Sequence, residues 1–202
     1  MLNIYFIRHC QTDYTPEGLI RDEKHLCKDG RQQAIELKKQ LQKSKIHFDA
    51  LYTSDMVRGI ETITPYALEE KIKIISKHAL QEINVNGTLH IGNDILKNFI
   101  IESKGNNSFK NPGWETLVGA RKRYFSIIEK IIKKHQSWSI LIVTHWLIFR
   151  EFLKHHFPAD PIDQLVISNP DVYKVQVKNN KILSYDREKS LVPENAVTRA
   201  HS

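Results

Sequence analysis

The chain has 202 residues, a formal net charge of +7, and 41% hydrophobic and 26% charged residues, which predicts one soluble globular domain. Its two cysteines, Cys10 and Cys27, do not form a CxxC pair. A disulfide framework and a zinc finger are therefore excluded, and a cytoplasmic location is expected. The N-terminus lacks the features of a signal peptide, and no apolar run approaches the length of a membrane span, so we expect no membrane partner.

The N-terminal half alternates short apolar runs with helical periods. The expected elements are a strand at 2–7, a helix at about 28–44, a strand at 48–53, a helix that begins at 54–55 and a strand at 71–76. Ser54 and Asp55 are good N-cap residues for the second helix. Pro65 lies well inside the same helix and is expected to kink or end it.

The C-terminal half opens with an irregular stretch, residues 83–112, which is rich in Asn and Gly and predicts an insertion or lid. The elements expected after it are a helix at about 114–135, a strand at 139–144, a helix that runs through His156, and a hairpin of 172–177 with 181–185. We therefore expect a single domain over 1–186 and a loose tail over 187–202.

Strands that alternate with helices predict an α/β fold, a three-layer αβα sandwich around a mostly parallel central sheet. In such sheets, ligands bind beyond the carboxyl ends of the strands. This rule draws attention to His9 and His145, because each directly follows a predicted strand.

Positive side chains accompany both histidines. Arg8 precedes His9, and Arg58 lies in the first turns of the helix after another strand. A phosphomonoester needs fixed positive charge, and the transition state of phosphoryl transfer spreads its charge over three oxygens. Guanidinium groups make bidentate contacts with phosphate, and a neutral imidazole can attack phosphorus to form a phosphohistidine. The pattern therefore favours phosphoryl transfer.

At this point the sequence resembles the histidine phosphatase superfamily, which includes the cofactor-dependent phosphoglycerate mutases, over residues from about 2 to 185. The segments that carry the resemblance, in chain order, are Ile7-Arg8-His9, the stretch from Leu26 to Ala34, the stretch from Ser54 to Thr62, Leu80-Gln81-Glu82, Gly113-Trp114-Glu115 and Val143-Thr144-His145. The resemblance implies the phosphoglycerate mutase-like fold.

The resemblance also implies roles for individual residues. His9 attacks phosphorus, and Arg8, Arg58 and His145 hold the phosphoryl oxygens. Glu82 protonates the leaving oxygen and later helps to deprotonate water, and Thr12 adds a hydroxyl contact to the phosphate. The resemblance implies no metal or other cofactor, and the acidic and histidine residues show no convincing spacing for metal ligands.

The sequence departs from the family pattern where the family usually has glycine. Cys10 follows the nucleophile, and Trp146 follows the second histidine. If either position requires a left-handed backbone, a larger residue costs roughly 1–2 kcal/mol. Nearby arginines would also favour a Cys10 thiolate, which raises the hypothesis of regulation by oxidation; a small residue tolerated in place of Gly is the simpler alternative.

A phosphatase that acts on a small phosphomonoester is the preferred function. The resemblance implies longer insertions and a C-terminal closure for a mutase, whereas this chain has one insertion of modest length and an unpatterned tail. A phosphoglycerate mutase-type phosphotransferase and a non-catalytic binder of phosphorylated ligands remain as alternatives. Nucleic-acid binding would rest only on net charge, so we expect no nucleic-acid partner. The natural substrate cannot be read from the sequence, and the chain is expected to be a monomer or a homodimer.

Overall fold

The computed structural model describes residues 1–12, 24–85, 99, 101–103, 106, 108–109, 112–162, 165 and 167–196. Its centre is a sheet with the strand order β3-β2-β4-β1-β5-β6. The strands are β1 (Leu2–Arg8), β2 (Ala50–Thr53), β3 (Ile74–Ser76), β4 (Ser139–Thr144), β5 (Val172–Lys178) and β6 (Lys181–Arg187). The first four strands run parallel to one another, whereas β5 is antiparallel to β1 and β6 is antiparallel to β5.

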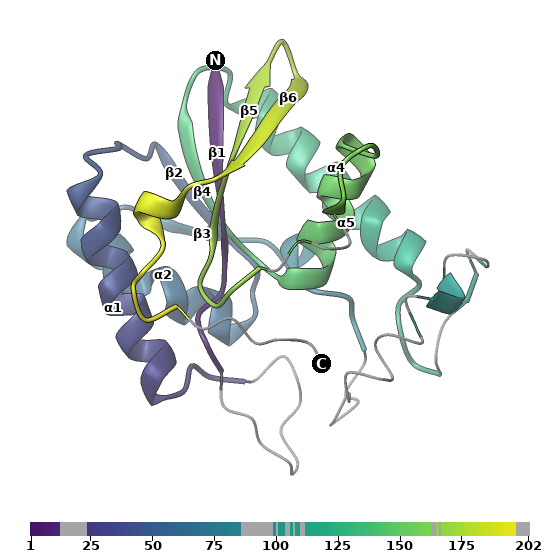
Figure 1. The fold of residues 1–202 in the computed structure, drawn as a ribbon, viewed down its shortest axis with the longest axis horizontal. Coiled ribbons are helices and arrows are strands. Elements are labelled where there is room, and N and C mark those ends of the chain that lie inside the picture. The colour runs from purple at the N-terminus through teal and green to yellow at the C-terminus, as the bar shows by residue number, and fades with distance from the viewer. Residues whose placement is uncertain are drawn as a thin grey trace.

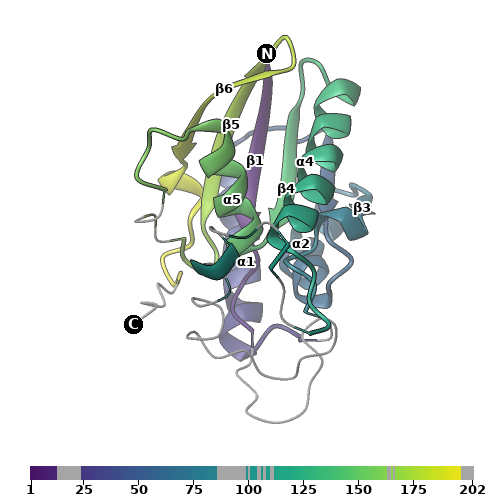
Figure 2. The ribbon, with the colours of Figure 1, turned by 90° about the vertical axis from the view of Figure 1, so that its right-hand side faces the viewer.

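Helices cover both faces of the sheet, as Figures 1 and 2 show. The α-helices are α1 (Lys28–Lys43), α2 (Val57–Glu69), α4 (Leu117–Lys134) and α5 (Trp146–His156), and short 3-10 turns are η2 (His78–Leu80) and η4 (Lys189–Leu191). The α1 and α2 helices lie on one face, and α4 and α5 lie on the other (Figure 1). The predicted three-layer sandwich with a mostly parallel sheet is therefore confirmed. None of the described helices is long and apolar enough to cross a bilayer.

Strand alternation divides the core into two clusters. Successive strand residues point to opposite faces, so Phe6 packs with Phe149 and Phe152 of α5 on one face. On the other face, Ile7 belongs to the cluster that contains Leu37 of α1. Both faces of the sheet are thus buried, which explains why the central strands read as continuous apolar runs.

The start and course of α2 differ from the prediction. The helix begins after Met56, which makes no side-chain cap. Ser54 and Asp55 do not cap it because their side chains bond elsewhere, Ser54 to His145 and Asp55 to Gln81. Pro65 does not end the helix, which continues to Glu69.

The chain from 187 to 196 is ordered by tertiary contacts, so the prediction of a loose tail from 187 is wrong for this part. Leu191 in η4 is fully buried in the cluster that contains Leu37. The backbone oxygen of Asn195 accepts a hydrogen bond from the side chain of Gln33 at 3.0 Å. The adjacent apolar residues Leu191 and Val192 give no helical or strand periodicity, which is why the sequence did not indicate this packing. Residues 197–202, and most of the predicted lid at 83–112, lie outside the described residues.

Candidate active site

The carboxyl ends of β1, β2 and β4 meet at one edge of the sheet. Arg8 pairs with Thr144 across β1 and β4, and Thr53 pairs with Val143 across β2 and β4. The residues that follow these strands therefore leave the sheet side by side. The rings of His9 and His145 lie with their centroids 5.2 Å apart, at an angle of 48°. The sequence-based expectation that the two histidines converge is met by this geometry.

His9 is held by its backbone and by one ring nitrogen. Its N–H donates to the carbonyl oxygen of Thr144 at 3.1 Å. Its Nδ1 lies 2.7 Å from the carbonyl oxygen of Cys10. A carbonyl oxygen only accepts, so Nδ1 carries the proton and, in the neutral ring, Nε2 carries the lone pair. This is the tautomer that a nucleophilic imidazole attacking through Nε2 requires.

A loop before β5 supports both Arg8 and His9. Asn169 donates from its side-chain amide to the carbonyl oxygen of His9 at 2.6 Å. The Arg8 guanidinium donates to the carbonyl oxygen of Ile167, and its backbone N–H donates to the carbonyl oxygen of Asp171 at 3.0 Å. The loop thus fixes the end of β1 from the side opposite to β4.

The carboxylate of Asp171 in turn fixes this loop. It is fully buried and accepts the backbone N–H groups of Ser168 at 3.1 Å and Val172 at 3.0 Å, together with Arg187 Nε at 2.8 Å. Burial raises the pKa of this carboxyl, although the hydrogen bond from Arg187 acts to lower it. Asn169 and Asp171 were missed by the sequence analysis. The Asn-Pro-Asp turn signal directly before the hairpin was the available clue.

Arg58 reaches the same edge from the first turn of α2. The residue is 3% exposed, and its Nη2 lies 2.9 Å from the sulfur of Met56. A Cβ on Gly59 would lie 2.7 Å from Thr53 Oγ1 and 2.9 Å from Ser54 Oγ. The absence of that atom therefore lets the turn that carries Arg58 pack directly on the end of β2.

A second contact ties α2 to the nucleophile. Thr62, one turn after Arg58, donates its hydroxyl to the carbonyl oxygen of Arg58 at 2.7 Å and accepts the backbone N–H of Cys10 at 2.9 Å. Arg58 and His9 are thereby held in one hydrogen-bonded unit. A guanidinium is suited to an anion with several oxygens, because its planar fork makes bidentate contacts.

His145 ends β4 and occupies the N-cap position of α5. Its Nε2 lies 2.8 Å from Ser54 Oγ, which links the ends of β2 and β4. The ring is 1% exposed, so its orientation is fixed by packing. The neighbouring Thr144 is also held, through a 2.7 Å contact between its hydroxyl and that of Tyr124.

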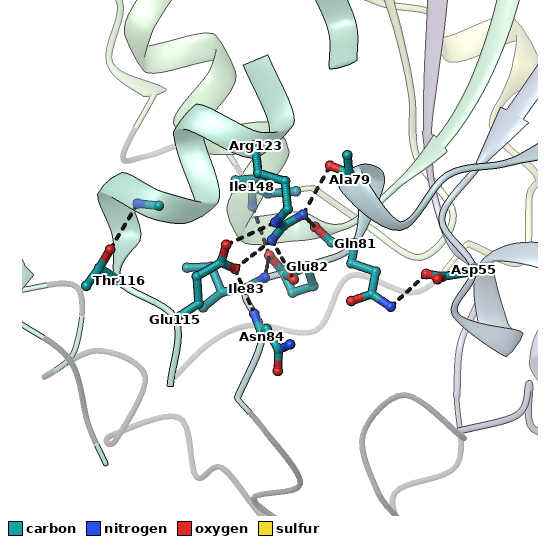
Figure 3. A network of polar contacts seen from close by, with 11 residues as sticks. Asp55, Ala79, Gln81, Glu82, Ile83, Asn84, Glu115, Thr116, Arg123 and Ile148 are labelled. Atoms are coloured by element: carbon teal, nitrogen blue, oxygen red, sulfur yellow. Dashed lines mark hydrogen bonds and ion pairs between the residues drawn. The ribbon is translucent and has the colours of Figure 1, made fainter. Parts of the chain in front are cut away.

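Glu82 meets the same end of α5. Its carboxylate accepts the backbone N–H groups of Leu147 at 2.9 Å, Ile148 at 3.0 Å and Ile83 at 3.1 Å. Figure 3 shows the contacts with Ile148 and Ile83. The residue is 3% exposed. The structure therefore places the Glu82 carboxylate at the N-terminal turn of α5, the helix that directly follows His145. Its role in proton transfer stays a prediction.

Thr12 lies on the loop that connects the nucleophile to α1, and its backbone forms an isolated antiparallel bridge with Leu26. Next to it, Gln11 donates its N–H to Gln33 Oε1 at 2.9 Å and accepts the N–H of Cys27 at 3.1 Å. A hydroxyl contact from Thr12 to phosphate stays a prediction. Gln11 and Thr12 are therefore anchored to α1 and to the residues just before it.

Cys10 and Trp146 fit without the backbone strain considered above. Neither has a positive φ, since the described non-glycine residues with positive φ lie elsewhere. Cys10 is fully buried, and burial raises the pKa of its thiol to about 12. The thiolate hypothesis is therefore contradicted, and Cys10 acts as a small core residue. Trp146 packs against the guanidinium of Arg150, whose central carbon lies 4.5 Å from the ring centroid.

Gly30 yields a prediction about the loop behind the nucleophile. A Cβ there would overlap the carbonyl oxygen of Gln11 and lie 2.9 Å from its carbonyl carbon, so backbone must move. We expect Gly30→Ala to lower stability by about 3 kcal/mol, which corresponds to a fall in Tm of roughly 6–12 °C. Thermal unfolding followed by circular dichroism measures this.

Gly119→Ala is the matched control, because the new Cβ would meet mainly side-chain atoms, the nearest being Thr116 Oγ1 at 3.0 Å. The helix propensity of Ala offsets part of that crowding. We expect its Tm to stay within a few degrees of wild type. Equal Tm values for the two variants would show that the loop after His9 is not packed tightly against α1.

The described residues include no group of three or more His, Cys, Asp or Glu side chains that could hold a metal ion. The imidazoles of His9 and His145 lie together at this edge of the sheet, and Arg8 and the buried Arg58 come from the end of β1 and the first turn of α2. Such a set can bind a tetrahedral oxyanion and supply a nitrogen nucleophile.

Comparison with known proteins gives matches over most of the chain. A family model described as "Histidine phosphatase superfamily (branch 1)" matches residues 4–185. Phosphoserine phosphatase 1 of Hydrogenobacter thermophilus is 21% identical over 160 residues, which cover 74% of this chain and 74% of that protein.

Solved structures agree with this match at the level of the fold. A phosphoserine phosphatase from Entamoeba histolytica, in complex with 3-phosphoglyceric acid, has a TM-score of 0.75 at 17% identity, over 95% of this chain and 100% of that one. A phosphoglycerate mutase from Bacillus anthracis str. Sterne has a TM-score of 0.74 at 21% identity, over 94% of this chain and 95% of that one. The fold found here is therefore shared with proteins of both names.

Proposed function

The chain belongs to branch 1 of the histidine phosphatase superfamily, and from this premise we propose that it is a metal-independent phosphomonoesterase with His9 as the nucleophile. The observation that carries the proposal is the 2.7 Å contact between His9 Nδ1 and the carbonyl oxygen of Cys10. This contact fixes the tautomer in which Nε2 carries the lone pair. The buried guanidinium of Arg58 supplies positive charge for a phosphoryl group.

In the first step, His9 Nε2 attacks phosphorus in line with the ester oxygen. A bond forms between nitrogen and phosphorus, and the bond between phosphorus and the ester oxygen breaks. Glu82 gives its proton to the departing oxygen, which leaves as an alcohol. Arg8, Arg58 and His145, with the hydroxyl of Thr12, bind the phosphoryl oxygens while their negative charge is redistributed.

In the second step, water attacks the phosphohistidine and gives a proton to the carboxylate of Glu82. The bond between nitrogen and phosphorus breaks, and inorganic phosphate leaves with His9 neutral again. Proton transfer of this kind typically contributes about 10²- to 10⁴-fold to the rate. Neither step requires a metal ion, because arginine and histidine side chains provide the positive charge.

The proposed substrate is a small phosphomonoester, in keeping with relatives named phosphoserine phosphatase. We also propose a cytoplasmic location, since both cysteines are free and buried. Assembly is proposed to go no further than a homodimer. The structural likeness to a protein named phosphoglycerate mutase makes mutase activity the alternative that the test must separate.

The test is a steady-state assay in EDTA with phosphoserine, an aryl phosphate and phosphoglycerate as substrates, with and without a bisphosphoglycerate primer, together with a measurement of phosphate binding. We expect phosphate release in EDTA that does not depend on the primer. Activity that appears only with the primer and moves phosphate between the hydroxyls of phosphoglycerate would establish the mutase. Binding of phosphate without any turnover would instead establish a non-catalytic binder.

A further inference from the structure

Arg123 of α4 and Glu115, just before that helix, form a polar pair that the proposed mechanism does not use. The pair contacts the backbone on both sides of Glu82, as Figure 3 shows. We propose that this pair, the Arg123–Glu115 clamp, consists of positioning residues that hold Glu82 for proton transfer to the leaving group. The proposal rests on the function proposed above.

Arg123 binds the chain before and at Glu82. Its Nη1 donates to the carbonyl oxygens of Ala79 at 3.1 Å and Gln81 at 3.0 Å, and its Nη2 donates to that of Glu82 at 3.2 Å. The side chain is 17% exposed. One guanidinium, largely shielded from solvent, thus binds three carbonyl groups of the segment that leads from η2 to Glu82.

Glu115 completes the clamp on the other side. Its Oε1 accepts Arg123 Nε at 3.0 Å and its Oε2 accepts Nη2 at 2.7 Å, which is a bidentate charge-assisted pair. The same Oε2 accepts the backbone N–H of Asn84 at 3.2 Å, and the backbone N–H of Glu115 donates to the carbonyl oxygen of Asn84 at 2.8 Å. The backbone is therefore fixed both before and after Glu82.

The side chain of Glu82 is held independently, by the N–H groups of Leu147 and Ile148 at the start of α5. The backbone of Glu82 is thus fixed by α4 and its carboxylate by α5, whose N-cap is His145. A displacement of about 1 Å at a reacting group can cost about 10²-fold in rate. The clamp therefore sets the position of Glu82 relative to the two histidines.

Lysine cannot replace arginine in this clamp. The fork of Arg123 uses Nε, Nη1 and Nη2 at once, toward the Glu115 carboxylate and the carbonyl oxygens of Gln81 and Glu82. A lysine ammonium is a single point with three donors and cannot span that set. Arg123→Lys keeps the positive charge but removes the planar fork of donor nitrogens. It therefore tests the geometry of the clamp separately from its charge.

The test compares kcat/KM for two substrates with different needs for an acid. Dinitrophenyl phosphate has a leaving group that departs without a proton, whereas phosphoserine has an alkoxide leaving group that needs one. We expect Arg123→Lys to lower kcat/KM about 10²-fold for phosphoserine and less than about 3-fold for dinitrophenyl phosphate. Glu82→Gln should show the same contrast, and adding Arg123→Lys to it should cause little further loss.

Arg121→Lys is the matched control. Arg121 lies on the same helix and also pairs with a carboxylate, that of Glu151 of α5. We expect kcat/KM for both substrates to be unchanged in this variant. If Arg123→Lys does not fold, Glu115→Gln, which keeps the side-chain shape, carries the same comparison and the same expectation.

Equal losses on the two substrates, or no loss on either, would overturn the clamp while wild-type activity stands. Absence in the wild type of any hydrolysis that depends on His9 would overturn the proposed function and the clamp together. The two failures are therefore distinguishable, because only the second removes activity on dinitrophenyl phosphate from the wild type.

Discussion

His9→Ala is expected to lower kcat for aryl phosphate hydrolysis by at least about 10⁴-fold, because the covalent pathway depends wholly on the nucleophile. The neighbouring imidazole of His145 is not expected to take over, since this residue is 1% exposed and its Nε2 is engaged with Ser54. The remaining arginines should still bind phosphate, so product inhibition by phosphate should persist. Initial rates in EDTA and inhibition by phosphate, measured on the same preparation, check both expectations.

His47→Ala is the control for this substitution. The His47 side chain is 85% exposed and lies at the far end of the sheet, before β2 begins. We expect wild-type kcat from this variant. Substantial activity in His9→Ala, with an unchanged Tm, would mean that water attacks phosphorus directly or that a different group is the nucleophile.

Arg58→Ala is expected to lower kcat/KM by about 10³-fold, the range seen when a fixed cationic or hydrogen-bonding group is removed from a phosphoryl or acyl transition state. Arg58 is buried at the start of α2, so its charge acts in a medium that screens it weakly. Arg58→Lys should lose about 10²-fold, because an ammonium keeps the charge but not the bidentate geometry. Affinity for vanadate, measured as inhibition, should fall in the same order.

Lys39→Ala controls for the loss of one positive charge. Lys39 lies on α1, its side chain is 59% exposed, and it pairs with Glu36 of the same helix. We expect kcat/KM to stay within about 2-fold of wild type, because surface charges are screened by salt. Unaltered vanadate affinity in Arg58→Ala would remove Arg58 from the phosphate site.

The fold could be predicted from the sequence because the pattern of apolar residues along the chain follows their burial in the core. The runs 2–7 and 139–144 are apolar on both faces, and each lies between two helical layers in the structure. The predictions that were wrong concerned features that depend on tertiary contacts. Ser54 reads as a helix cap, yet its hydroxyl is bonded to His145. Leu191 gives no periodic signal, yet it is fully buried.

The residues of the site likewise fall into those that the sequence could predict and those that it could not. Arg8, His9 and His145 could be found because they follow strands whose carboxyl ends must share one edge of the sheet. Asn169 supports His9 from a loop more than a hundred residues away, a contact that no local pattern encodes. The same holds for the bonds between Glu82 and the start of α5.

The most direct test of the central claim is to trap the phosphoenzyme. Wild type and His9→Ala are mixed with labelled phosphomonoester in EDTA, quenched in alkali within a single turnover, and digested for mass spectrometry. We predict an alkali-stable, acid-labile phosphoryl group on the peptide that contains His9, and none in His9→Ala. Label on another residue, or turnover with no labelled protein at any time before steady state, would contradict the assignment of His9 as the nucleophile.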